Sequence, residues 1–163
     1  MGCDIHLYAE VRKRKTLLDK LQFWKPKKWV NIDKWTKNKY YGEDKWEPEF
    51  KIESNNQFYT GGRNYNLFSA LCGVRNYYFE PVPKMITPPK GMPKNVSEIV
   101  KKEIERYGSD GHSHSWNTLE ELLSFDWSEY GESCDKFLKE VLPKMKAQNV
   151  SPKDVRIVYF FDN

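Results

Sequence analysis

The carboxyl-terminal run constrains the fold more than any other part of the chain. Residues 154–163 (DVRIVYFFDN) are β-branched and aromatic almost without interruption, which is typical of a buried central strand. The opening run, residues 3–10 (CDIHLYAE), alternates strictly between apolar and polar side chains, as a half-buried strand does. We expect these two terminal strands to form the core pair of one sheet, with Asp162 near one end of the first strand.

Between these runs, hydrophobic spacing and capping residues predict helices at about 64–74, 95–107, 118–123 and 133–147. Residues 28–34 and 45–52 resemble the two strands of a hairpin, and the proline-rich stretch 81–93 predicts an extended connection. The sequence therefore predicts a single α+β domain over residues 1–163. We expect a small, mainly antiparallel sheet that includes both terminal strands and is packed with about four helices on one face.

Composition sets the broad class of the protein. Hydrophobic residues make up 39% of the chain and aromatic residues 15%, which argues against global disorder. The cysteines Cys3, Cys72 and Cys134 are odd in number and lack CxxC spacing, so a disulfide framework or a four-cysteine zinc site is not supported. We expect a cytoplasmic protein, because no targeting segment is visible and no apolar stretch is long enough to span a bilayer.

The segment at about 13–40 looks like a basic, aromatic, hairpin-like insertion. Between Val11 and Lys51, 13 Lys/Arg face 6 Asp/Glu, a net charge of +7, whereas the whole chain carries +4. Basic side chains interleaved with tryptophans could contact nucleic acid weakly through phosphates and stacking. We favour the other interpretation, a solvated hairpin whose aromatic side chains cover a sheet edge, because acidic residues dilute the charge.

The three histidines fall in two short segments, each with its own aspartate. His6 follows Asp4 in the opening run, and His112 and His114 follow Asp110 in the glycine-rich stretch 108–116. Imidazole and carboxylate together perform acid/base chemistry near neutral pH or bind transition metals. A loop whose hydrogen bonds only anchor the following helix is the alternative for the second segment.

We predict that the two histidine segments converge in one site. The candidate catalytic residues are His6, Asp110, His112 and His114. The candidate ligands of a divalent metal, which would be zinc, manganese or iron, are Asp4, His6, Asp110, His112, His114 and Asp162.

A second group of side chains could bind a negatively charged ligand. Two glycines precede the helix expected at about 64–74, so free backbone N–H groups could hold an anion there, with Arg63 supplying charge. The alternative is plain helix capping by Asn64 and Arg75. The candidate ligand-binding residues are Arg63, Asn64, Tyr65, Arg75 and Trp116.

These motifs also carry a family resemblance. They are MGCDIH at the start, RNY at 63–65 with GVRN at 73–76, GSDGHSHSW at 108–116, and the tail VRIV to FDN. The chain resembles a family of uncharacterised phage and prophage proteins over nearly its whole length, except the basic segment. The resemblance implies a bacteriophage source and the cytoplasm of an infected host cell, and it supplies no established catalytic role.

Three classes of function remain open at this stage. The leading expectation is a phage accessory protein that hydrolyses a phosphate-bearing, nucleotide-type substrate, by analogy with small phage proteins that counter host defence. The second is a non-catalytic protein that sequesters a nucleotide signal. The third is a nucleic-acid or host-protein interaction factor that works through the basic segment.

Overall fold

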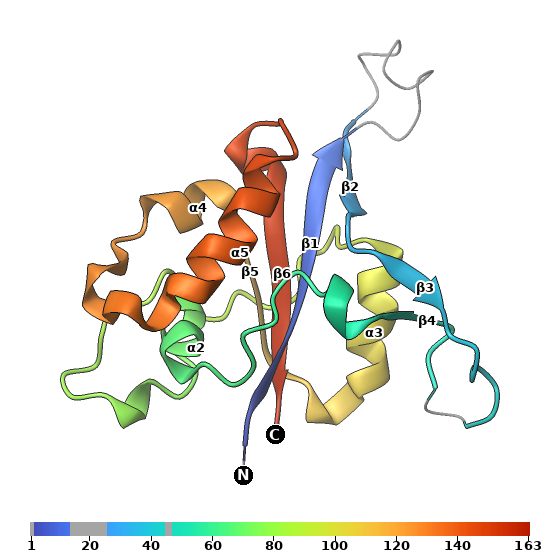
Figure 1. Ribbon diagram of the computed structural model, residues 1–163, viewed down its shortest axis with the longest axis horizontal. Coiled ribbons are helices and arrows are strands. Elements are labelled where there is room, and N and C mark those ends of the chain that lie inside the picture. The colour runs from blue at the N-terminus through green and yellow to red at the C-terminus, as the bar shows by residue number, and fades with distance from the viewer. Residues whose placement is uncertain (1, 14–25, 45–46) are drawn as a thin grey trace.

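The computed structural model describes residues 2–13, 26–44 and 47–163, which fold around a four-stranded antiparallel sheet (Figure 1). The strand order is β2 (Lys28–Asn31), β1 (Asp4–Lys13), β6 (Val155–Asp162) and β5 (His112–Thr118). Every residue of β6 from Val155 to Phe161 is buried. The predictions of an α+β fold and of a sheet that includes both terminal strands are confirmed.

The expectation that helices cover one face of the sheet is wrong. α2 (Tyr65–Cys72), α4 (Leu119–Ser124) and α5 (Asp135–Lys146) pack on one face, and α3 (Glu98–Tyr107) packs on the other (Figure 1). Because β1 alternates, Tyr8 and Glu10 lie on the face that α3 covers, and both are buried. The face of β1 that looks polar in the sequence is therefore half interior.

The helix boundaries follow from local capping residues. The Asn64 side chain accepts a hydrogen bond from Leu67 N–H at the start of α2, and Thr118 forms a reciprocal capping box with Glu121 in α4. α3 begins three residues later than the helix predicted from residue 95, because Ser97 is its N-cap, and the Ser97 side chain makes no capping bond. Short 3₁₀ turns, η1 (Ser54–Asn56), η2 (Asn76–Tyr78), η3 (Gly108–Asp110), η4 (Trp127–Cys134) and η5 (Pro152–Asp154), complete the connections.

The hairpin expected from residues 28–34 and 45–52 is also wrong. β2 pairs with β1, and β3 (Trp35–Lys37) pairs with β4 (Phe50–Ile52) in a separate two-stranded sheet. The pairing of β2 with β1 ends after Asn31, where the Asp33 carboxylate accepts hydrogen bonds from the Ala9 N–H (3.0 Å) and the Asn31 side chain (2.6 Å). This bend directs the following residues away from the main sheet.

A buried ion pair joins β1 to β6 at the end where β2 lies. The Arg156 guanidinium contacts Glu10 at 2.6 Å and 2.8 Å and also donates to the Asn95 side chain at 3.0 Å. The second Glu10 oxygen accepts from Ser97 N–H at 2.8 Å, and the ring of Trp29 covers the guanidinium at 3.9 Å. All of these groups therefore serve packing.

The described part of the basic segment is also engaged in the fold. Arg12 and Lys27 both donate to Asp154 at 2.7 Å. The ring of Trp35 stacks on Tyr8 at 5.8 Å, in line with aromatic side chains that cover the sheet. Residues 14–25 of the predicted insertion, and residues 45–46 of the predicted strand, lie outside the described part of the chain.

Candidate functional site

The candidate site lies at the end of the sheet where the two termini meet (Figure 1). The register pairs Asp4 with Asp162 and His6 with Phe160 across β1 and β6. Directly paired residues of antiparallel strands share a face, so Asp4, His6 and Asp162 lie on the α3 side. The convergence of Asp162 with the first histidine segment follows from two strands of matched length and unbroken register.

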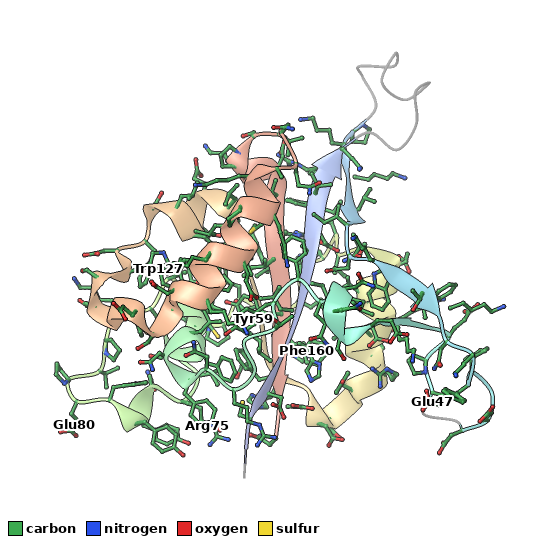
Figure 2. All side chains as sticks on the ribbon, viewed as in Figure 1. Glu47, Tyr59, Arg75, Glu80, Trp127 and Phe160 are labelled. Atoms are coloured by element: carbon green, nitrogen blue, oxygen red, sulfur yellow. The ribbon has the colours of Figure 1, made fainter. Side chains whose placement is uncertain are left out.

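His6 packs against two aromatic rings, Tyr107 and Phe160, which also contact each other at 5.0 Å. Its ring lies 4.3 Å from that of Tyr107 at a tilt of 46° and stacks on Phe160 at 4.8 Å, and Figure 2 shows Phe160 on the α3 side of β6. His6 Nε2 lies 3.2 Å from Asp162 Oδ2, at ion-pair distance although off the direction of a hydrogen bond. The side chains of His6 and Asp162 keep 22% and 26% of their exposure, although the Nε2 atom of His6 is itself buried.

The second histidine segment is a strand, not the loop predicted from its glycines. Its pairing with β6 shifts register between His112 and Ser115, and Ser113 adopts a φ of 50°, as expected for a β-bulge. Because of the bulge, the side chains of His112 and His114 lie on opposite faces of the sheet. His112 stacks on Phe161 at 6.1 Å, and His114 stacks on Phe160 at 5.4 Å.

Because Phe160 and Phe161 point to opposite faces of β6, the HxH motif is split across the sheet. His112 Nδ1 is 3.0 Å from Ser113 Oγ, and burial lowers the pKa of His114, with His112 lowering it further. Nε2 of both histidines is buried without a hydrogen-bond partner in the described structure. His114 therefore shares a face with His6, on the far side of Phe160, and His112 does not.

The structure does not assemble the expected metal ligands into one set. Among residues 2–13, 26–44 and 47–163, no three His, Cys, Asp or Glu side chains gather closely enough to hold a metal ion. Asp110 is exposed in η3, and both oxygens of Asp4 accept hydrogen bonds from Arg63. The physical reasons are the bulge in β5 and the insertion of Phe160 between His6 and His114.

The predicted ligand-binding arginines lie near the same end of the sheet but are engaged. Arg63 donates to Asp4 at 2.8 Å and 2.7 Å and lies against Gly2, where any side chain would collide with it. Arg75 donates to Tyr77 at 2.6 Å and to Asn163 at 3.0 Å, and Figure 2 shows it beside the termini.

The other predicted ligand-binding residues have structural contacts. Asn64 caps α2 and also donates to the Ser133 carbonyl at 2.6 Å. Tyr65 stacks on Tyr78 at 5.9 Å. The Trp116 ring lies 3.7 Å under the Lys90 ammonium, away from His6.

A cavity of about 240 Å³ lies beside His6, between β1, β4 and α3. Its wall includes His6, Leu7, Trp35, Lys51, Arg106 and Tyr107. His112 and His114 do not line it. Sequence reasoning missed Lys51, Arg106 and Tyr107, although Tyr107 directly precedes the glycine-rich stretch and could have been found there. Lys51 could not, because its place depends on the pairing of β3 with β4.

No family model matches the chain, and no curated protein or solved structure is significantly similar to it. Within the described residues, no helix has the length and apolar character needed to cross a membrane.

Proposed function

We propose that the protein is a hydrolase for a phosphate-bearing, nucleotide-type substrate, with His6 as the acid/base residue. The observation that supports this most directly is that His6 lies in the wall of a cavity and contacts Asp162, which is outside that wall, at 3.2 Å. With a carboxylate beside one ring nitrogen, an imidazole can exchange a proton with a ligand through its other nitrogen.

Two cations in the same wall account for the charge of the substrate. Lys51 and Arg106 line the cavity together with His6, and Lys51 also makes an exposed ion pair with Glu53 at 3.3 Å. Arg106 also donates to both oxygens of Glu103, at 3.2 Å and 2.7 Å. These cations can stabilise negative charge that develops on a phosphoryl group. The resemblance to phage proteins adds, by analogy alone, a counter-defence role against a nucleotide signal of the infected cell.

Sequestration without turnover is the second candidate, and one observation favours it. Glu103 is the acidic side chain in the wall of this cavity, and Arg106 occupies both of its oxygens. The cavity therefore offers no spare carboxylate to activate water. A protein that binds the same ligand and releases it unchanged would need only the cations and the rings.

Incubation with mono-, di- and cyclic nucleotides, followed by chromatography, separates the two candidates. Product formation supports hydrolysis, and ligand recovered unchanged after denaturation supports sequestration. His6→Gln should reduce turnover by roughly 100-fold or more, the usual contribution of an acid/base residue. His114→Gln is the matched control, because His114 stacks on the other side of the same Phe160 ring but lies outside the cavity. Equal losses in the two variants would contradict the assignment of His6.

A further inference from the structure

One edge of β1 lacks a partner strand along the cavity. β2 pairs with β1 from Glu10 to Lys13, whereas β6 pairs with it from Asp4 to Val11. In the described part of the chain, the stretch of β1 from Asp4 to Tyr8 therefore has a neighbouring strand on one edge alone. The cavity beside His6 lies against this stretch, and its wall includes Ile5 and Leu7.

The backbone groups of Ile5 and Leu7 point toward this open edge. The Ala9 N–H donates to Asp33 at 3.0 Å and the Ala9 carbonyl accepts from Ile32 N–H at 3.0 Å, so both Ala9 groups face away from β6. In a regular antiparallel strand the N–H and C=O of one residue face the same edge, and every second residue repeats that direction. The register is unbroken from Asp4 to Val11, so Leu7 and Ile5 share the direction of Ala9.

These backbone groups are available to a ligand. No residue that the structure describes makes a hydrogen bond to the outward N–H or C=O of Leu7 or Ile5. Ile5 and Leu7 are partly exposed, so water or a ligand in the cavity can supply the partner that backbone polar groups require. The backbone N–H and C=O of Leu7 lie side by side along the strand. They are complementary to a planar ligand edge that carries a hydrogen-bond acceptor next to a donor.

The walls of the cavity suit a flat ring. Trp35 and Tyr107 line it together with Tyr59. Trp35 is fixed by its stack on Tyr8, at an interplanar angle of 8°, and by the hydrogen bond from its indole N–H to Asn31 at 2.6 Å. Stacking on aromatic walls stabilises any heteroaromatic ligand and does not distinguish one base from another. Hydrogen bonds to the backbone edge would supply that base specificity.

We propose that the cavity binds a nucleotide with the hydrogen-bonding edge of its base on the backbone of Leu7 and Ile5. The phosphate then lies toward Lys51 and Arg106, the two cations in the same wall. This base site extends the proposed function. It depends on the proposed hydrolase only for the fate of the bound phosphate. A base-reading site of this kind uses no side chain, so side-chain motifs in the sequence do not reveal it.

Amide hydrogen exchange measured by NMR tests the base site directly. In the free protein, the amides of Leu7 and Ile5 should exchange faster than those of His6 and Tyr8, which face β6 and serve as internal controls. The ligands are the four common ribonucleoside monophosphates and, as the base-free reference, ribose 5-phosphate. At least one nucleotide should bind tenfold or more tightly than ribose 5-phosphate and slow exchange at Leu7.

Two results would overturn the base site. One is that no nucleotide binds more tightly than ribose 5-phosphate. The other is that a nucleotide binds but leaves exchange at Leu7 and Ile5 unchanged, which would place the base elsewhere or leave water as the partner of these groups.

A charge reversal separates the base site from the hydrolase. Lys51→Glu should weaken binding of the monophosphate about tenfold and leave binding of the matching nucleoside unchanged. Lys37→Glu is the control, because Lys37 lies on the neighbouring strand and outside the cavity. Nucleoside binding with protection of Leu7 but without turnover would support the base site and contradict the hydrolase. Turnover without protection of Leu7 would support the hydrolase and contradict the base site.

Discussion

The two ends of the β1–β6 pair carry similar charged groups on the same face of the sheet but treat them differently. At one end, Glu10 and Arg156 are 0% and 2% exposed, and Asn95 and Ser97 satisfy the remaining groups of the pair. At the other end, His6 and Asp162 are still about a quarter exposed, and Nε2 of His6 lacks a hydrogen bond. The closed end, Glu10 and Arg156, has both charged groups hydrogen-bonded away from solvent, whereas the open end, His6 and Asp162, stays partly exposed.

The difference shows that complete hydrogen bonding, rather than charge, distinguishes a structural cluster of polar side chains from a candidate site. A fully hydrogen-bonded ion pair away from water rigidifies the core and offers nothing to a substrate. A partly exposed imidazole beside a cavity can exchange protons with a substrate through its second ring nitrogen. The comparison predicts that substitutions at the closed end change stability and that those at the open end change binding or turnover.

The largest effect is expected at the closed end. Arg156→Met leaves the Glu10 carboxylate buried without its cation and should lower the free energy of unfolding by about 3–5 kcal/mol. In a chain of this length, each kcal/mol lowers the melting temperature by roughly 2–4 °C. Thermal unfolding followed by circular dichroism measures the change.

The double variant Glu10→Leu with Arg156→Met provides the control. Replacing both charges with apolar side chains removes the uncompensated charge, so it should recover most of the lost stability. A double variant as unstable as the single one would show that the shape of the pair, rather than its charge, holds this end together.

The parts of the fold that could be predicted are those whose sequence pattern has a single structural explanation. Alternation in β1 and the apolar run of β6 identified the core strands, because a strand period of two and full burial leave direct marks on the sequence. The coverage of both faces was not predictable, because Tyr8 and Glu10 look solvent-facing until α3 is placed over them. The pairing of β2 with β1 depends on the hydrogen bonds of Asp33, which no periodicity reveals.

The candidate site was predictable only in part, for a similar reason. The register of β1 and β6 brings Asp162 to Asp4 and His6, as the two terminal patterns indicated. The separation of His112 from His114 depends on a bulge at Ser113, a residue whose positive φ is unusual outside glycine. The cavity cations come from β4 and the end of α3, so they required the tertiary structure.

A second prediction sharpens the comparison, because one group near the closed end is not fully satisfied. Burial raises the pKa of Asp33 to about 6, against the hydrogen bonds that it accepts from Asn31 and Ala9, and its Oδ1 has no partner in the described structure. A carboxyl group whose pKa is raised by folding stabilises the folded state at low pH. That contribution is complete below about pH 4 and is lost as the pH rises through about 6.

The expected loss is about 3 kcal/mol, because each pKa unit corresponds to about 1.4 kcal/mol. Urea unfolding of the wild-type protein and of Asp33→Asn between pH 4 and 7 measures it. The free energy of unfolding of the wild type should fall by this amount relative to the variant, which cannot ionise there. Parallel pH profiles would mean that Asp33 is ionised at the same pH in the folded and unfolded chains.

The smallest effect is expected at Asp4 and Arg63. The direction of the change in phosphate binding there tests the open end. Their ion pair is exposed, and exposed pairs contribute little to stability, so Asp4→Asn should leave the melting temperature unchanged. Arg63 loses a charged partner in this variant, and its guanidinium becomes available to an anion. We therefore expect Asp4→Asn to tighten phosphate binding a few-fold by calorimetry, whereas Arg63→Gln leaves it unchanged. If Arg63→Gln instead weakens binding, Arg63 already serves the ligand in the native protein, and the open end has a wider binding surface than the cavity beside His6.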